Sequence, residues 1–351
     1  MSENLVHYTS MNGLKGIIEG DSLRFTKSEY LNDPQDCELL LSLIDNYYST
    51  NYAIEPEASN TSFNRILAKA SPIDYIKYVL KKINFYVLSF SSLSDDLSMW
   101  NYYGSGGAQI TVNNEILRKS LISKLAGERE FIVEGEVIYI DEEDIKKIEI
   151  DFSQCKLFDK SGEEVFQKDK EIAKTVAKNT SLYSIKSMSE FFDKFLDDYK
   201  ISLHYLDDNK IVNENSSTND IFLSIFENVI DLDDKMLWKR DMLMYIIVLN
   251  ILIKSKGYAC EKEHRIAYFG LPPNKKDEYG IKCINGFEYI YPFITFNNLG
   301  LNNFVENVIL SPLVRNNSID EGIYCETIKN YLENKKIYSK IVEISKHKKR
   351  W

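Results

Sequence analysis

Two glutamates and an arginine stand two residues apart in the last third of the chain, as Glu261-x-Glu263-x-Arg265. In a β-strand this spacing directs all three side chains to one face, with Lys262 and His264 on the other. Two buried carboxylates beside one guanidinium must be paired, so we expect Arg265 to hold one of them. The other can then accept a hydroxyl hydrogen bond or act as a base, unless the strand is exposed and merely salt-bridged.

His7, Tyr8 and Thr9 form a second candidate group near the beginning of the sequence. On a strand, His7 and Thr9 face one side and Tyr8 the other. The imidazole can donate to a ribose hydroxyl, and the adjacent tyrosine offers a flat apolar face. By itself, such a histidine more often bonds a local backbone carbonyl.

A third group combines Ser89-Phe90-Ser91 with Met99-Trp100-x-x-Tyr103-Gly104. Trp100 and Tyr103 are neighbours on one face if this segment is helical. They could stack on a planar ring such as nicotinamide, with the hydroxyl of Ser89 or Ser91 nearby. The alternative is a pair of core aromatics, the commoner state of an isolated tryptophan.

Asn32-Asp33-Pro34 is a weaker candidate, because these side chains can simply fix a turn. Other chemistries lack their motifs. The sequence has no Gly-x-x-x-x-Gly-Lys-Ser/Thr, no Gly-x-Gly-x-x-Gly after a first strand and no His-Glu-x-x-His. The five cysteines form no Cys-x-x-Cys pair and the four histidines lack metal-ligand spacing, so we expect reduced thiols and no metal.

The elements that must position these residues follow from hydrophobic periodicity. Strands are expected over 5–8, 22–26, 85–90, 108–112, 134–140, 260–268, 289–293, 304–309 and 338–344. A first helix is capped by Thr9 or Ser10 and ends at Gly20, and further helices are expected over 37–48, 95–103, 239–253 and 321–332. Strands at both ends with helices between them predict an α+β fold rather than a regular βαβ alternation.

We expect a single domain over 1–351, with its core formed by 1–140 and 235–345. The segment 141–234 is charged, glycine-poor and helical in pattern, which predicts a helical insertion or lid without a catalytic motif. The net charge of -10 disfavours a general nucleic-acid coat protein. The sequence begins without a signal peptide and has no apolar run of roughly 20 residues, so we expect a cytoplasmic protein that does not cross a membrane.

Taken in order, these motifs resemble a bacterial family known as domain of unknown function 2971. The matching residues are His7-Tyr8-Thr9-Ser10, Ile17-Ile18-Glu19-Gly20, Leu23-Arg24-Phe25, Asn32-Asp33-Pro34, Ser89-Phe90-Ser91, Met99-Trp100-x-x-Tyr103-Gly104 and Glu261-x-Glu263-x-Arg265. The resemblance covers the two ends of the chain and hardly touches 141–234. The opening segment also looks like that of DNA-targeting ADP-ribosyltransferase toxins and RNA 2′-phosphotransferases.

That resemblance implies a split, two-sheet ADP-ribosyltransferase-like core that binds NAD in a cleft. It places His7 on the adenosine ribose or a phosphate, with Trp100 or Tyr103 on nicotinamide. It makes Glu263 or Glu261 the catalytic acid, with Glu263 the more important of the two, and it counts His7 among the catalytic residues. By the same resemblance, His7, Tyr8, Thr9, Asn32, Ser89, Trp100, Tyr103 and Arg265 are the candidate NAD-binding residues. No strong Ser-Thr-Ser or arginine signature stands in the middle of the chain, where many such enzymes carry one.

The resulting expectation is an NAD-dependent ADP-ribosyltransferase-like enzyme that acts on a protein or nucleic-acid acceptor. By the family resemblance alone it could be a toxin or an anti-phage defence effector with an antitoxin or defence-system partner. Three alternatives stay open: an NAD glycohydrolase, a non-catalytic module that binds a nucleotide or a protein, and a metal-dependent nuclease that uses Glu261 and Glu263.

Overall fold

The structure analysed is a computed structural model of the chain. It describes residues 4–31, 37–40, 42, 85–104, 106–126, 130–141, 156–158, 160–162, 249–270, 276–284, 287–316, 320–338 and 341–347. The Asn32-Asp33-Pro34 turn and nearly all of the insertion expected over 141–234 lie outside the described residues.

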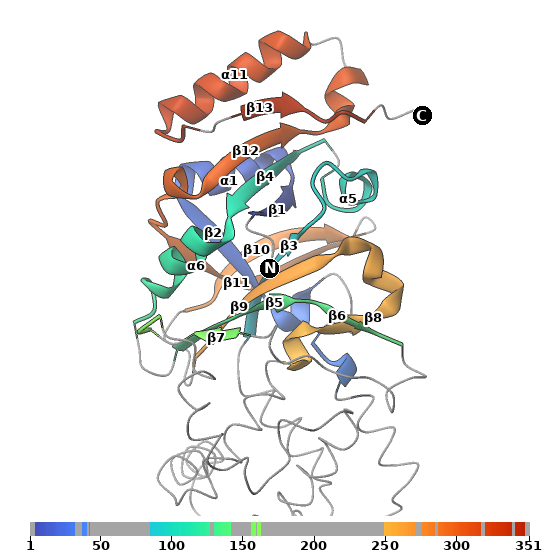
Figure 1. Cartoon of the computed structure of the whole chain (residues 1–351), viewed down its shortest axis with the longest axis vertical. Coiled ribbons are helices and arrows are strands. Elements are labelled where there is room, and N and C mark those ends of the chain that lie inside the picture. Colours follow the sequence, from blue (N-terminus) through green and yellow to red (C-terminus); the bar gives the residue numbers. More distant parts are fainter. Residues whose placement is uncertain are drawn as a thin grey trace, which may run out of the picture.

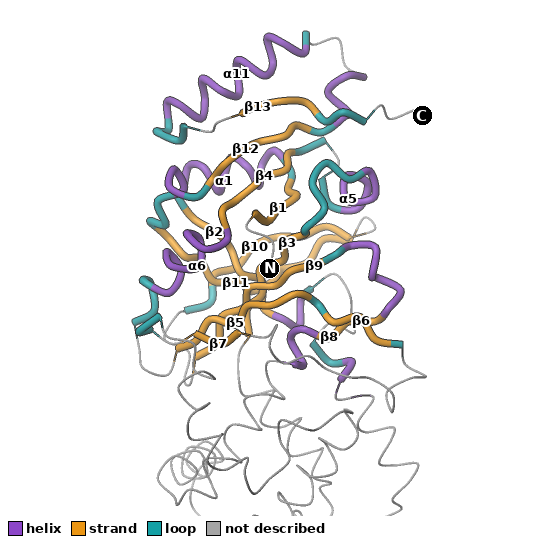
Figure 2. Tube along the Cα trace, viewed as in Figure 1, coloured by secondary structure: helices purple, strands orange, loops and turns teal. Residues whose placement is uncertain are grey.

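The described residues form a mixed α+β structure with a large, mostly antiparallel sheet and few helices (Figure 1). The strands are β1 (Asn4–Thr9), β2 (Ser22–Lys27), β3 (Phe85–Ser91), β4 (Ala108–Asn113), β5 (Glu130–Glu136), β6 (Ile138–Ile140), β7 (Lys156–Phe158), β8 (Ile253–Ser255), β9 (Glu263–Gly270), β10 (Glu278–Ile284), β11 (Phe287–Asn297), β12 (Val305–Leu310) and β13 (Ile341–Ile344). The helices are α1 (Met11–Gly20), α5 (Leu97–Tyr102), α6 (Asn114–Ile122) and α11 (Glu321–Asn334), with 3-10 turns η1 (Ser28–Tyr30), η5 (Lys256–Glu261), η6 (Leu301–Asn303) and η7 (Pro312–Asn316). Figure 2 shows the strands running through the middle of this part of the protein and the helices lying around them.

Strand β3 is the branch point of the sheet. One edge of β3 pairs with β9 along its whole length, and β9 continues to β5 and β7. The other edge is shared by two strands, which lead into the arms β2-β11-β10 and β1-β4-β12-β13. All of these pairings are antiparallel except that of β12 with β13. A separate pair, β6 and β8, is parallel.

The shared edge of β3 opens a gap in the sheet. Strand β2 pairs with β3 only at Thr26↔Val87 and Lys27↔Tyr86, and β1 only at Val6↔Ser91. Between these contacts the end of β1 and the beginning of β2 both leave β3, and α1 connects them. The backbone of residues 88–90 therefore has no strand neighbour on this edge among the described residues.

Helix α1 crosses from β1 to β2 in the way that its sequence predicts. The Ser10 hydroxyl accepts the Gly13 N–H at 3.0 Å, which caps the first turn, and the apolar face buries Leu14 and Ile18. The helix ends at Gly20 as expected, but the residue in the left-handed conformation is Asp21, with φ of 43°, and not the glycine. Its carboxylate accepts the N–H groups of Gly300 and Leu301, which stabilises this unusual conformation and ties α1 to η6.

Several predicted boundaries are also wrong, for local reasons. Strand β9 begins at Glu263 and not at Cys260, because Lys262 adopts a left-handed conformation, with φ of 45°, after η5. The helix expected up to Ile253 gives way to β8 at that residue. Lys156–Phe158, inside the expected helical insertion, is a strand that extends the sheet beyond β5.

The main hydrophobic core lies between the sheet and helices α1, α6 and α11. Phe25, Tyr268 and Phe296 are fully buried in it, and the ring of Phe296 packs against both others. Helix α11 adds Ile328 and Leu332. No described helix has the length and apolar composition needed to cross a bilayer.

Two glycines provide a test of the packing at the beginning of α1. A Cβ on Gly107 would lie 1.9 Å from the Thr9 carbonyl oxygen, whereas a Cβ on Gly16 would meet nothing within 4 Å. We expect Gly107→Ala to lower the free energy of unfolding by roughly 1–3 kcal/mol, because the backbone must shift. Gly16→Ala should be neutral or stabilise by up to about 1 kcal/mol, since alanine favours the helix. Urea denaturation measures both, and equal midpoints would contradict the expected close contact.

Candidate functional site

A cavity of about 670 Å³ lies where β1 and β2 separate from β3. Its walls come from β1, α1 and β2, its floor from β3, and one side from the residues around η5. The polar side chains that border it include those of His7, Arg24, Ser89, Tyr103, Lys254, Glu261 and Glu263. The branching of the sheet therefore creates both the space and the opening onto a charged cluster.

Glu263 and Arg265 form the innermost part of that cluster. Arg265 is 1% exposed and donates from Nε to Oε1 of Glu263 at 2.8 Å and from Nη2 to Oε2 at 3.0 Å. Its Nη1 also donates to the Ile251 carbonyl at 2.7 Å. Because these bonds hold the guanidinium behind Glu263, Arg265 does not border the cavity, and its expected contact with NAD is not part of this arrangement.

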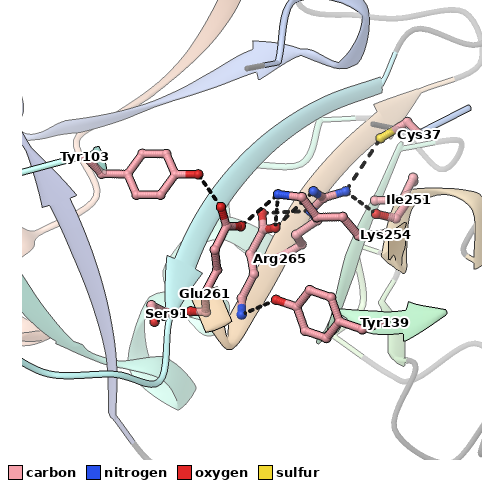
Figure 3. A network of polar contacts seen from close by, with 9 residues as sticks. Cys37, Ser91, Tyr103, Tyr139, Ile251, Lys254, Glu261 and Arg265 are labelled. Atoms are coloured by element: carbon pink, nitrogen blue, oxygen red, sulfur yellow. Dashed lines mark hydrogen bonds and ion pairs between the residues drawn. The ribbon is translucent and has the colours of Figure 1, made fainter. Parts of the chain in front are cut away.

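Glu261 is held separately, by a lysine and a tyrosine (Figure 3). The Tyr103 hydroxyl donates to Oε1 of Glu261 at 2.5 Å, and Lys254 Nζ donates to Oε2 at 2.8 Å. Lys254 also donates to Oε2 of Glu263 at 3.1 Å, so a single ammonium bridges the two carboxylates. All three charged side chains are less than one-tenth exposed.

Backbone contacts explain how Glu261 reaches Glu263 although it precedes the strand. The left-handed residue Lys262 turns the chain between them, and the Ser91 hydroxyl donates to the Glu261 carbonyl at 2.6 Å. The Glu263 N–H donates to the Tyr139 hydroxyl at 2.8 Å. The expected common face of Glu261 and Glu263 is thus produced by a turn and not by strand alternation.

His7 lies at the gap in the sheet. Its Nδ1 is 3.0 Å from the Ser89 carbonyl, on the stretch of β3 that has no strand neighbour on that edge. Since a carbonyl only accepts, Nδ1 carries the hydrogen of this bond. Burial lowers the pKa of His7, so at neutral pH the ring is uncharged and Nε2 is an acceptor.

Trp100 lies in a different place from the one expected. Its side chain is fully buried, packs edge-on against Tyr8 at 5.0 Å between ring centroids, and donates Nε1–H to Asp95 at 2.8 Å. Its ring therefore cannot stack on a ligand in the cavity. Tyr103, three residues later, borders the cavity as expected.

The structure brings His7, Thr9, Ser89, Tyr103, Glu261 and Glu263 to one cavity, and Tyr8 contributes to its wall although its ring faces Trp100. Asn32 lies outside the described residues. The sequence interpretation missed Lys254, Tyr139 and Arg24 as site residues. Lys254 had a detectable signal, because a single lysine after the apolar Ile251–Ile253 must find a charged partner if it is buried.

The two carboxylates differ in their remaining hydrogen-bonding capacity. Glu263 accepts from Arg265, Lys254 and the Ser89 hydroxyl, which fills the roughly four acceptor positions of a carboxylate. Although burial acts to raise it, the pKa of Glu263 is lowered to about 2, mainly by the Arg265 charge. Within the described residues Glu261 accepts only from Tyr103 and Lys254, and so has capacity for a further donor.

Comparison with protein-family models found no match, nor did comparison with curated proteins or with solved structures.

The depressed pKa of Glu263 predicts how stability depends on pH. A carboxylate with a pKa near 2 when folded and 4.5 when unfolded stabilises the fold above about pH 4.5, and this is lost as the pH falls towards 2. We expect Glu263→Gln to cost roughly 3 kcal/mol at pH 7. The difference from the wild type should shrink below pH 4.5. Glu134, whose pKa is also lowered to about 2, is present in both proteins and cancels.

Chemical denaturation between pH 3 and pH 7 measures this difference. Glu136→Gln is the matched control, because Glu136 is exposed on β5. If the free energy of unfolding of Glu263→Gln stays below that of the wild type by the same amount across this pH range, then ion pairing does not hold Glu263 in its ionised form.

Proposed function

We propose that the protein is an NAD-consuming, ADP-ribosyltransferase-like enzyme with a split-sheet core. The observation that carries this is a buried pair of carboxylates, one saturated and one with spare capacity, on the border of a 670 Å³ cavity. Small-molecule and cofactor sites in proteins typically have volumes of about 300–1,000 Å³. The order of motifs shared with the resembled family supports the same assignment.

The distribution of charge around the cavity suits a dinucleotide with an anionic and a cationic part. Arg24 and the N-terminal turn of α1, with Asn12 and Gly13, border the cavity and favour phosphate groups. Glu261 and Glu263 favour the positively charged nicotinamide riboside part. His7, with Nε2 as an acceptor, can receive a hydrogen bond from a ribose hydroxyl between them.

The reaction cleaves the bond between the ribose and the nicotinamide nitrogen. The bonding electron pair leaves with nicotinamide, which becomes neutral, and positive charge develops on the ribose. Ionised Glu263, held by Arg265, stabilises that charge electrostatically without giving up a proton. Glu261 accepts a hydrogen bond from the ribose 2′-hydroxyl, or it removes the proton of the incoming acceptor as the new bond to the ribose forms.

Tyr103 gives the cavity wall an aromatic ring beside the carboxylates, and we assign to it the nicotinamide contact expected of either Trp100 or Tyr103. Its hydroxyl is used by Glu261, so the ring lies beside the carboxylate that acts on the ribose. The proposed acceptor is a protein or a nucleic acid. Water takes the acceptor's place if the enzyme is an NAD glycohydrolase.

Replacing Glu261 tests the reaction in a variant in which Lys254 keeps Glu263 as an ionic partner. Glu261→Gln should lower nicotinamide release at least 100-fold, because the amide cannot act as a base, while NAD affinity changes only a few-fold. The measurements are nicotinamide release by chromatography and NAD binding by calorimetry, with Glu136→Gln as the control. Wild-type protein that releases no nicotinamide with protein, DNA or RNA would contradict the proposal.

The products separate the remaining possibilities. Free ADP-ribose that accumulates without an acceptor indicates hydrolysis. Thermal stabilisation by NAD without turnover indicates a binding module. Activity on nucleic acid that disappears with a chelator indicates a nuclease.

His7→Asn tests the ribose contact independently. The asparagine amide can still donate to the Ser89 carbonyl, as Nδ1 does, but it does not replace Nε2. We expect the KM for NAD to rise roughly tenfold, equivalent to about 1.4 kcal/mol, with a smaller change in kcat and an unchanged melting temperature. An unchanged KM in a folded variant would remove His7 from the binding site.

A further inference from the structure

We infer that Lys254 is a positioning residue that bridges the carboxylates of Glu261 and Glu263, and that removing its charge costs the site its activity at low pH. Its effect on catalysis rests on the proposed function, whereas its effect on Glu261 does not.

Lys254 is buried, and a buried ammonium is stable only when it is paired and hydrogen-bonded. It lies on β8, is 5% exposed, and donates to Glu261 at 2.8 Å and Glu263 at 3.1 Å. Its ammonium also lies 4.5 Å from the centre of the Tyr258 ring, a cation–π distance. These contacts come from η5 and β9, so the position of Nζ is determined from more than one side.

The two carboxylates depend on Lys254 to different degrees. Glu263 has Arg265 as a second cation, through two hydrogen bonds. Among the described residues, Glu261 has Lys254 as its one ionic partner, and its other contact is the neutral hydroxyl of Tyr103. Removing the ammonium charge therefore acts mainly on Glu261.

Within the part of the chain that the structure describes, the surroundings supply no substitute for that charge. The titratable and charged groups that face the cluster are Lys254 on β8, Tyr258 on η5, Tyr103 next to α5, Tyr139 on β6, His7 on β1, and Glu263 and Arg265 on β9. Burial raises the pKa of Tyr139 to about 12 and lowers that of His7, so both are uncharged near neutral pH. Without Lys254, ionised Glu261 would be buried beside another negative charge.

A buried carboxylate in that situation takes up a proton instead. A protonated Glu261 can neither remove a proton from an acceptor nor accept a hydroxyl as strongly as the anion does. Loss of the Lys254 charge should therefore shift the working range of the site to higher pH. An opposite charge at such a distance typically lowers a carboxyl pKa by roughly 1–3 units, which sets the size of the expected shift.

The main variant is Lys254→Gln, which keeps a hydrogen-bond donor and removes only the charge. Lys254→Arg should retain the wild-type behaviour, and Lys254→Met provides a second neutral variant. The control is Lys256→Met, because Lys256 is exposed and pairs with exposed Asp141 at 3.7 Å. All four are compared with the wild type without any ligand.

The first measurement is a carboxyl titration by NMR with carbon-labelled glutamate, in which Glu261→Gln identifies the Glu261 signal. In Lys254→Gln, that signal should titrate roughly 1–3 pH units higher than in the wild type, and Lys254→Arg should restore it. An unchanged titration in folded Lys254→Gln would overturn the inference. If both neutral variants fail to fold, Lys254→Arg provides the test. Because arginine keeps the positive charge, a Glu261 signal that titrates roughly 1–3 pH units higher in Lys254→Arg than in the wild type would also overturn the inference.

The second measurement is the pH profile of nicotinamide release. The acidic limb of kcat/KM should move up in Lys254→Gln, so that activity falls at least tenfold at pH 6 and recovers at pH 8, whereas a merely structural role would lower activity at all pH values. A shifted NMR titration in a protein that releases no nicotinamide would reject the proposed function and retain the role of Lys254. Nicotinamide release together with an unshifted NMR titration in Lys254→Gln would support the proposed function and reject the role of Lys254.

Discussion

One edge of β3 cannot pair with two strands along the same residues, and the rest of the structure follows from this constraint. Strands β1 and β2 both run antiparallel to β3 on that edge. Strand β2 pairs with the first residues of β3, and β1 pairs with its last residue. The opposite edge is fully occupied by β9, which holds β3 in place. The cavity is the space that this competition leaves, and His7 satisfies a carbonyl that no strand reaches.

The same branching explains why charged residues can be buried at the cavity. Strand β9 carries Glu263 and Arg265 next to β3, and the turn at Lys262 returns Glu261 to the same place. Each buried charge there has an opposite charge within hydrogen-bonding distance, as the low dielectric of the interior requires. Lys254 joins the two halves of the cluster, because its ammonium donates to both Glu261 and Glu263.

Much of the fold was predictable where local patterns are strong. The segments at β1, α1, β2, β3 and β4 were placed within one or two residues, because their apolar alternation or capping residues are unambiguous. The hairpin of β10 and β11 was largely missed, since exposed Ile281 and Ile290 obscure the alternation of buried and exposed positions. The strand of residues 156–158 was missed because its charged surroundings in the sequence resemble a helix.

The candidate site was predictable in its members more than in their roles. Glu261, Glu263, Tyr103 and His7 carry functional groups in recognisable order, and the structure brings them to one cavity. Trp100 could not be separated from Tyr103 by spacing alone, because helical periodicity defines a shared face but not which residue meets the core. The fully buried Trp100 packs against Tyr8, which reaches it from β1, and donates to Asp95 just before α5.

The sequence by itself determined which chemical groups are available and the local elements that carry them, because side-chain chemistry, caps and alternation act over a few residues. The tertiary structure alone decided which of the two carboxylates Arg265 holds, and that Lys254 bridges them. The paired residues lie only two to nine positions apart in the chain, so their pairing is decided by the turn at Lys262 and by the loss of solvent around them. Residue spacing does not encode this local geometry, and the strength of each charge pair depends on it.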